Sequence, residues 1–354
     1  MKSINIAVQE EKVSNKIAAS GQFEMFKKGG EKVEKGTLLV GEPMGLFIAQ
    51  EKGEFEDVSG YTMALAGAEF NVAVGMRRLG HRVGYFTKLG NDPFGKRVIK
   101  MMKAENISTE LIRFAEDHFT GFMLKSKVEK GDPDIFYFRR NSAASTLNAG
   151  DIEELDFNGY DAIHMTGITP ALSESAREAV AALLEKTQEN GMCFTFDPNL
   201  RPQLWGDQKV MCDYMNDIAG KSDMFLPGIS EARILTGLEE PERIADYYLT
   251  KGAKTIIIKL GSVGAYYASG NENGYAEGFK VDQVVDTVGA GDGFAAGVLT
   301  GFREGLSMKE AVRRGNAVGA IQVMSIGDND GLPTIQELNR FMSGQKDWRT
   351  GGSL

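Results

Sequence analysis

The sequence has few of the residues that mark secreted, metal-binding or membrane proteins. It contains two cysteines, Cys193 and Cys212, and three histidines, too few for a disulfide framework or a zinc site. No run of about 18 apolar residues occurs, and the N-terminus, MKSINIAVQEEKVSNK, is charged where a signal peptide would be apolar. We therefore expect a cytoplasmic protein with no membrane partner.

Positive charge is also scarce. Forty lysines and arginines stand against 49 acidic residues, and the formal net charge of −9 disfavours nucleic acid as a partner, since binding it requires a basic face. An anionic substrate would have to be met by a few well-placed cations. The remaining composition, 42% hydrophobic and 25% charged, is typical of a globular protein that can form one large α/β domain or two small ones.

The first 36 residues differ from the rest because they are polar and have no steady apolar period. We expect residues 1–36 to be an N-terminal extension, either a frayed or added leader or an arm used in regulation or assembly. The folded domain is expected over residues 37–341, and residues 342–354 are expected to form a C-terminal tail.

From Thr37 onward, short apolar runs alternate with helical patterns. Runs that end in glycine, proline or a polar residue are typical of buried parallel strands, and here they are TLLVGEP, RVGYFTKLG, YDAIHMTG, MCFTFDPN, DMFLPG and KTIIIKLG. Segments such as AEFNVAVGMRRLG and SESAREAVAALLEKTQENG have helical periodicity. This alternation predicts a three-layer α/β fold, with a parallel sheet covered by helices on both faces.

Two stretches, at about residues 45–65 and 118–141, break the alternation. Apolar and polar residues alternate there around glycine-rich turns, which predicts antiparallel strands with one wetted face. We expect them to form a small accessory sheet that acts as a lid, a dimer surface or both. A homo-oligomer, either a dimer through this lid or a higher assembly, is expected because exposed sheet edges tend to be covered.

The segment VVDTVGAGDGFAAG, residues 284–297, has β-branched residues, then a glycine-rich turn, then small residues at helical spacing. Such a turn opens a helix whose first N–H groups are unpaired. Gly289, Ala290 and Gly291 would let the backbone approach a phosphoryl group. Asp292 beside them suits a base that deprotonates an attacking hydroxyl while Mg²⁺ offsets the charge. The segment predicts phosphoryl transfer to an alcohol; the alternative is an aspartate that only caps the helix.

This segment resembles the C-terminal signature of the ribokinase-like (PfkB) carbohydrate kinases, and AGAEFNVAVGMRRLGHRVGYFTKLG resembles their N-terminal signature. The resemblance extends from about Thr37 to Phe341. It implies a Rossmann-like core with a β-sheet lid, ATP and Mg²⁺ as partners, and Asp292 as the catalytic base. Some members of this family also hold a monovalent cation near the position of Asp286.

The resemblance implies further roles on the metal and nucleotide side. LPGISEARILTG lies where the family has an Asn-x-x-Glu motif that organises Mg²⁺ through water; Glu231 is kept, whereas Gly228 replaces the asparagine. Asn316 falls near the family's adenine pocket. The alternative for Asn316 is a polar residue on the solvent-facing side of a helix. The residues implied to lie on the nucleotide side are Lys259, Gly261, Gly264, Gly289, Gly291 and Asn316.

Two arginines suggest an anionic sugar. Arg201 follows the strand in MCFTFDPN, so it lies at the carboxyl edge of the sheet, where its fork suits a carboxylate or phosphoryl oxygen. Tyr137 and Arg139 are two residues apart and therefore share one face of a lid strand. This pair suits a sugar acid better than a neutral hexose; a surface ion pair is the alternative for Arg139.

The segments YFRRNSAAS, DPNLRPQLW and AGAEFNVA are together similar to those of the 2-keto-3-deoxygluconate kinases of this family. This similarity implies ATP-dependent phosphorylation of the 6-hydroxyl of that sugar acid, with substrate contacts from Gly67, Asn71, Tyr137, Arg139, Arg201 and Asp292. Fructokinases share the DPNxRxxLW segment, so a fructokinase or another sugar kinase of the family stays open. A non-catalytic sugar-acid sensor is the remaining alternative, although it would be expected to lack Asp292 or the glycine turn.

Overall fold

The computed structural model describes residues 35–128, 133–345 and 348–349. The predicted N-terminal extension lies outside the described residues except for its last two, and Gly36 already belongs to the first strand. The predicted C-terminal tail is only partly described. Its Trp348 ring lies 5.2 Å from the ring of Phe341, so this part of the tail packs against the last helix.

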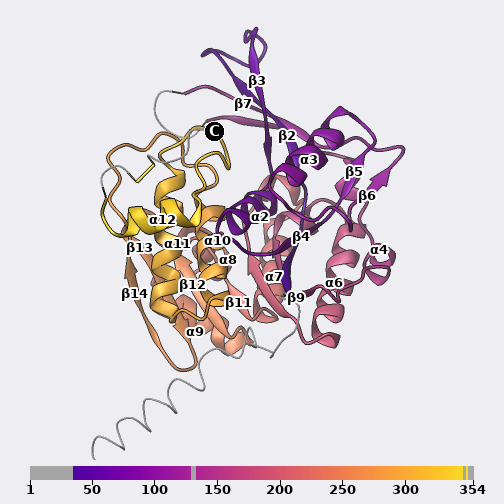
Figure 1. Ribbon diagram of the computed structural model, residues 1–354. Coiled ribbons are helices and arrows are strands. Elements are labelled where there is room, and N and C mark those ends of the chain that lie inside the picture. The colour runs from indigo at the N-terminus through magenta and orange to yellow at the C-terminus, as the bar shows by residue number, and fades with distance from the viewer. Residues whose placement is uncertain (1–34, 129–132, 346–347, 350–354) are drawn as a thin grey trace, which may run out of the picture.

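Eight strands form the central sheet, in the order β14-β13-β12-β11-β10-β9-β1-β4 (Figure 1). Their bounds are β1 Gly36–Val40, β4 Val83–Phe86, β9 Tyr160–Thr166, β10 Cys193–Asp197, β11 Met224–Phe225, β12 Thr255–Lys259, β13 Gly264–Ser269 and β14 Asn273–Glu277. The strands from β12 to β4 run parallel, as predicted. The expectation of a wholly parallel sheet was wrong at one edge, where β13 and β14 pair antiparallel, because their connections are too short for a crossover helix.

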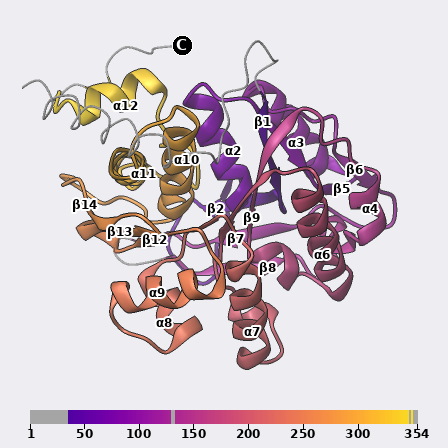
Figure 2. The ribbon, with the colours of Figure 1, turned by 90° about the horizontal axis from the view of Figure 1, so that it is seen from below.

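Helices cover both faces of this sheet, as predicted (Figure 2). One layer contains α2 Ala68–Arg78, α3 Pro93–Ala104, α10 Ala290–Arg303, α11 Met308–Gln322 and α12 Ile335–Met342. The other contains α4 Ala149–Glu153, α6 Glu174–Glu189, α7 Gln208–Gly220, α8 Ile229–Thr236 and α9 Pro241–Lys251. In β12, Ile257 packs into the first layer and Ile256 and Ile258 into the second, so both faces of the strand are buried.

A separate four-stranded sheet, here called the lid sheet, has the order β3-β2-β7-β8 and rises at the top of Figure 1. Its strands are β2 Met44–Ala49, β3 Tyr61–Ala66, β7 Phe122–Lys125 and β8 Ile135–Phe138. The predicted accessory sheet is thus confirmed, with two antiparallel hairpins. The middle pair, β2 and β7, is parallel rather than antiparallel, because a long segment containing α2 and α3 connects the hairpins.

Smaller elements complete the described chain. These are the parallel pair β5 Lys88–Gly90 and β6 Arg113–Ala115, the short helix α5 Ile168–Ala171, and 3₁₀ turns at Ala143–Thr146, Pro202–Leu204 and Gly261–Val263. Within the described residues, no helix combines the length and the apolar character needed to span a membrane.

Candidate active site

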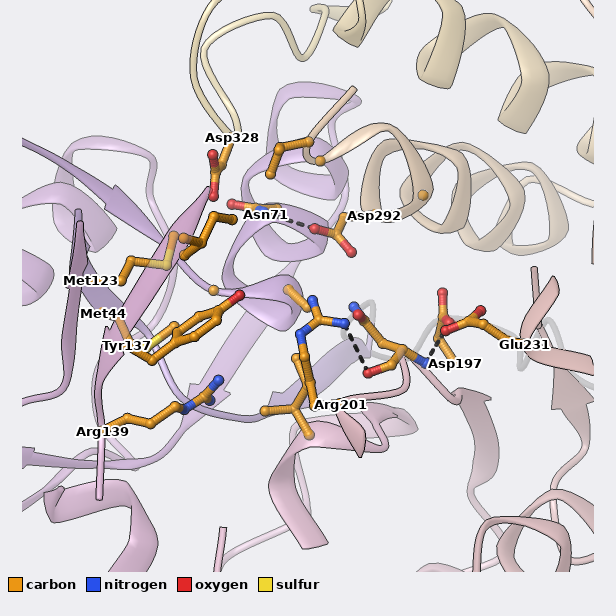
Figure 3. Close-up of a pocket in the computed structure, with 18 of the residues that line it drawn as sticks. Met44, Asn71, Met123, Tyr137, Arg139, Asp197, Arg201, Glu231, Asp292 and Asp328 are labelled. Carbon is orange, nitrogen blue, oxygen red and sulfur yellow. Dashed lines mark hydrogen bonds between the residues drawn. The ribbon is translucent and has the colours of Figure 1, made fainter. Parts of the chain in front are cut away.

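A cleft of about 340 Å³ separates the lid sheet from the carboxyl ends of the central strands, a size that suits a small ligand (Figure 3). Met44, Met123, Ile135 and Ile168 form its apolar wall. The predicted site residues that line it are Gly67, Asn71, Tyr137, Arg139, Arg201, Glu231, Lys259, Gly289, Gly291 and Asp292. Ala290, Gly261, Gly264 and Asn316 do not line this cleft. The fold therefore brings every predicted substrate residue together.

The glycine turn opens helix α10, as predicted. Gly289 has a φ of +78°, and a Cβ there would lie 2.0 Å from the Asp328 carbonyl oxygen, so the turn itself requires glycine. A Cβ at Gly291 would meet only the Lys259 Nζ, at 3.6 Å. Among the described residues, the N–H groups of Gly289 and Gly291 have no hydrogen-bond acceptor, whereas that of Ala290 donates to the Thr287 carbonyl oxygen at 3.3 Å. Two of the three predicted amides are thus open to an anion.

Asp292 lies in the first turn of α10, beside these amides. Part of its side chain faces the cleft, but the surrounding protein removes enough water to raise the pKa of its carboxyl group to about 7. The Asn71 Nδ2 opposes this increase by donating to Oδ2 at 2.7 Å. The Asp197 carboxylate raises the pKa further, and the Lys259 ammonium lowers it. Asp292 is therefore a stronger base than an ordinary aspartate and titrates near neutral pH.

Lys259, at the end of β12, is paired with the carboxylate of Asp197 at the end of β10, with β11 between the two strands. Its Nζ lies 2.5 Å from the Oδ2 of Asp197. Burial raises the pKa of Asp197 to about 6 in spite of this ammonium. The pair lies at the carboxyl ends of β12 and β10, and the Lys259 Nζ is 3.6 Å from the position of a Cβ on Gly291, so Lys259 can reach an anion bound at the glycine turn.

The positive charge of Arg139 is also balanced by a carboxylate, which the sequence did not predict. It is only 4% exposed, and its Nε and Nη2 lie 2.8 and 2.5 Å from the Oε2 of Glu42. The Ser142 hydroxyl donates to the other oxygen of Glu42. The alternative, an ion pair on the lid surface, was correct about the ion pair and wrong about its place, because Arg139 and Glu42 are both buried. Glu42 was missed, although an acidic residue directly after the apolar run TLLVG could have suggested it.

Arg201 differs from the other two cations. Its Nη1 donates to the carbonyl oxygens of Asn199, at 3.2 Å, and Leu200, at 2.9 Å. No carboxylate pairs with it among the described residues. Figure 3 shows Arg201 between the lid residues Tyr137 and Arg139 on one side and Asp197, Glu231 and Asp292 on the other. Its charge is therefore available to an anionic ligand.

Glu231 holds the loop that carries Arg201. Its Oε1 accepts from the N–H of Leu200 and its Oε2 from the N–H of Gly228, both at 2.8 Å. The described residues contain no group of three acidic, histidine or cysteine side chains that could hold a metal ion directly. Each carboxylate oxygen of Glu231 keeps acceptor capacity for water, so the residues fit a Mg²⁺ ion held mainly by water and phosphate oxygens.

The remaining nucleotide-side candidates make contacts of another kind. Asn316 is buried, not solvent-facing, and its Nδ2 donates to the carbonyl oxygens of Ala276 and Glu277 at 2.9 and 3.1 Å. A Cβ at Gly264 would lie 2.1 Å from the Ala276 oxygen, so close strand pairing explains that glycine. Gly261 has a φ of +63° in the turn before β13. These contacts join α11 to the β13–β14 hairpin.

A three-layer α/β fold with a lid sheet, open amides at a glycine turn and a buried carboxylate is typical of small-molecule kinases. The chain belongs to the pfkB family of carbohydrate kinases, whose family model matches residues 37–335. The family resemblance inferred from the two signatures is thereby confirmed.

Known proteins resemble this chain over most of its length. It is 48% identical to the 2-dehydro-3-deoxygluconokinase of Bacillus subtilis (strain 168) over 311 residues, which cover 88% of this chain and 96% of the relative. The crystal structure of the PfkB protein from Polaromonas sp. JS666 matches with a TM-score of 0.80 and 39% identity, covering 86% of this chain and 99% of the other. A putative ribokinase II from E. coli, in complex with ATP and Mg²⁺, matches with a TM-score of 0.80 and 26% identity over 88% and 100% of the two chains. The predicted ribokinase-like fold is confirmed.

Proposed function

We propose that the protein transfers the terminal phosphoryl group of ATP to the 6-hydroxyl of 2-keto-3-deoxygluconate, also called 2-dehydro-3-deoxygluconate, to give the 6-phosphate. The observation that carries this proposal is the charge of Arg201, which no described carboxylate balances. A carboxylate on the sugar would balance it, whereas a neutral hexose would leave it unpaired in the closed cleft. The 48% identity to a 2-dehydro-3-deoxygluconokinase supports the same substrate.

The lid side of the cleft would orient the sugar. Arg139 carries no net charge together with Glu42, so it acts as a fixed hydrogen-bond donor rather than as a second counter-ion. Tyr137 and the apolar wall cover the carbon chain. Gly67, whose φ is +136°, keeps the backbone close to the Glu42 carbonyl oxygen, where a Cβ would clash at 2.7 Å. Gly67 and Asn71 then contact the sugar close to Asp292, the proposed catalytic base.

Asp292 would take the proton of the 6-hydroxyl as the oxygen attacks. The amides of Gly289 and Gly291 bind the oxygens of the transferring group, and the ammonium of Lys259, whose charge Asp197 balances, donates beside them. ATP would supply the phosphoryl group. Glu231 would hold Mg²⁺ through water, and the ion would offset the negative charge of the phosphates. The lid sheet excludes water, which would otherwise accept the phosphoryl group. The adenine ring of ATP would lie next to Gly261, Gly264 and Asn316.

An ammonium group of the chain itself lies beside Asp286. Lys125, on lid strand β7, has its Nζ 2.6 Å from the Oδ2 of Asp286 and 3.1 Å from the Oδ1 of Asp328. All three side chains are buried. The Lys125 ammonium lies between the carboxylates of Asp286 and Asp328 and supplies a positive charge there, so we propose that turnover does not depend on added potassium.

The protein is also proposed to act as a cytoplasmic homodimer through the outer face of the lid sheet. Phe136 and Phe138 on β8 are 54% and 38% exposed, and Phe138 stacks on Phe122 with ring centroids 4.5 Å apart. An exposed aromatic face of this kind favours a protein partner, and a second copy of the chain would cover it symmetrically.

The test is ADP release with Mg·ATP and a panel of acceptors: 2-keto-3-deoxygluconate, its C4 epimer, fructose, ribose and adenosine. We expect kcat/KM for the keto-deoxy acids to exceed that for fructose by about a hundredfold, which corresponds to about 2.7 kcal/mol. A preference for fructose would refute the sugar-acid assignment and leave the kinase assignment intact. Binding of the acid without turnover would indicate a sensor.

A further inference from the structure

A chain of buried hydrogen bonds leads from a lid strand to Asp292. The Asn329 Nδ2 donates to the carbonyl oxygen of Leu65, in β3, at 3.2 Å and to the Oδ1 of Asn71 at 2.9 Å. The Asn71 Nδ2 in turn donates to the Oδ2 of Asp292 at 2.7 Å. Asn71 and Asn329 are 2% and 3% exposed. Asn329 belongs to neither signature segment, and no sequence pattern indicated a role for it.

The Leu65 carbonyl fixes the donor-to-acceptor direction of these hydrogen bonds. A backbone carbonyl can only accept, so the NH₂ group of Asn329 must face Leu65. The second hydrogen of that group occupies the oxygen of Asn71. The NH₂ group of Asn71 is then left to face Asp292, whereas a flipped Asn71 would set its oxygen against a carboxylate oxygen.

We propose that Asn329 is a positioning residue: it fixes the side-chain amide of Asn71 so that the NH₂ group always faces Asp292. The inference rests on Asp292 acting as the base, as proposed above. Asn329 does not line the cleft and acts only through Asn71.

The loop that carries Asn329 is held independently of the base. The Arg78 Nη1 donates to the carbonyl oxygens of Asn329 and Leu332 at 3.0 and 2.9 Å. The Gln322 Nε2 donates to the oxygen of Gly327 at 2.8 Å, and Lys125 pairs with Asp328. The amide of Asn329 is thus presented from a fixed backbone, which is what a positioning role requires.

Removing Asn329 has a defined consequence. The Asn71 amide could then rotate, and in one orientation it would repel the Asp292 carboxylate instead of donating to it. Because this donation lowers the pKa of Asp292, its partial loss raises that pKa. The other groups that act on Asp292 are Asp197 on β10, Lys259 on β12, Glu69 on α2 and Tyr85 on β4. All of these remain in an Asn329 variant.

The experiment is the pH dependence of kcat/KM for Asn329→Ala, Asn71→Ala and the double variant. We expect Asn329→Ala to move the acid limb upward by about half a pH unit or more and to recover activity at high pH. In the Asn71→Ala background, Asn329→Ala should add no further shift. Asn329→Asp has the same shape, and its ionised carboxylate can only accept from Asn71. It should therefore shift the limb at least as far, through the lost donation and the added negative charge. Asp330→Asn, at an exposed neighbouring position, is the matched control without a shift.

The inference is overturned if the folded Asn329 variants keep the wild-type acid limb, or if the shift persists undiminished without Asn71. An Asp292→Asn variant separates this failure from failure of the proposed function. Near-normal turnover of Asp292→Asn would refute the base itself. An inactive Asp292→Asn with an unshifted Asn329→Ala would refute only the positioning role.

Discussion

At the scale of single residues, Gly289 and Gly291 are required for different reasons. The backbone of Gly289 is left-handed and touches the Asp328 carbonyl, so the fold needs a glycine there. Gly291 has space for a Cβ, and that space faces Lys259 in the cleft. The same residue type therefore serves the turn at one position and the ligand at the other.

This difference predicts that substituting Gly291 mainly lowers activity, whereas substituting Gly289 lowers stability. Gly291→Ala should keep the melting temperature within a few degrees but lower kcat by about a hundredfold or more, because the methyl group fills the anion site. Gly289→Ala should lower stability by at least about 1–3 kcal/mol, which is the cost of the left-handed backbone. The clash of its methyl group with the Asp328 carbonyl oxygen adds to this cost. Thermal unfolding and steady-state kinetics of both variants check this. Full turnover of Gly291→Ala would refute a ligand role for its open amide.

The raised pKa of Asp292 predicts a pH dependence of activity. A base must be deprotonated, so kcat/KM should rise with pH through about 7 and level off above it. Asp292→Asn should lower turnover by several orders of magnitude and leave ATP binding largely intact. An acid limb near pH 4 would show that Asp292 titrates as an ordinary aspartate.

The same shift has a consequence for stability. Since the folded pKa lies above the unfolded value of 3.8, ionising Asp292 disfavours the folded state as the pH rises from about 4 through 7. Asp292→Asn should therefore gain stability relative to the wild type above pH 7 and lose that advantage at pH 4. Denaturant unfolding at the two pH values measures the difference.

Measurements of stability and of KM should distinguish the roles of Arg139 and Arg201. Arg139→Met leaves Glu42 buried without a counter-charge and should cost about 3–5 kcal/mol of stability, part of which a Glu42→Gln/Arg139→Met pair should restore. Arg201→Met breaks no described ion pair and loses only two hydrogen bonds to carbonyl oxygens, so it should cost less stability than Arg139→Met. It should raise KM for the sugar acid by at least about tenfold. An unchanged KM in Arg201→Met would remove the residue from the substrate site.

At the scale of elements, the lid sheet is joined to the active-site loops by a side chain of one strand and a backbone carbonyl of another. Lys125 of β7 reaches Asp286 and Asp328, and the Leu65 carbonyl of β3 orients Asn329. Since the Asp286 Oδ1 also accepts from the N–H of Val288, Lys125 acts on the turn that precedes α10. The position of the lid and the geometry of the anion site are therefore coupled.

Replacing Lys125 tests this coupling. Lys125→Met leaves two buried carboxylates without their ammonium and should destabilise the protein by about 3–5 kcal/mol. Lys127→Met, at an exposed position two residues along, should change stability by less than about 0.5 kcal/mol. Wild-type activity should be equal in potassium and tetramethylammonium buffers. A strict potassium requirement would contradict the role given to Lys125.

At the scale of the whole molecule, the aromatic outer face of the lid sheet predicts self-association. Phe136→Asp combined with Phe138→Asp should convert the dimer to a monomer, because two carboxylates would be buried in the interface. Light scattering of the wild type and the variant measures the mass directly. A wild type that is monomeric at micromolar concentration would refute the lid interface.

The sequence alone determined the three-layer fold, the lid strands, the glycine turn and Asp292, because each depends on local periodicity or on adjacent residues. Only the tertiary structure decided which charges are balanced: Glu42 and Arg139 are 97 residues apart, and Lys259 and Asp197 are 62 apart. The antiparallel edge of the sheet and the chain from Leu65 through Asn329 to Asp292 were likewise beyond local patterns. Pairing and hydrogen-bond direction depend on distances between segments, which exist only once the chain has folded.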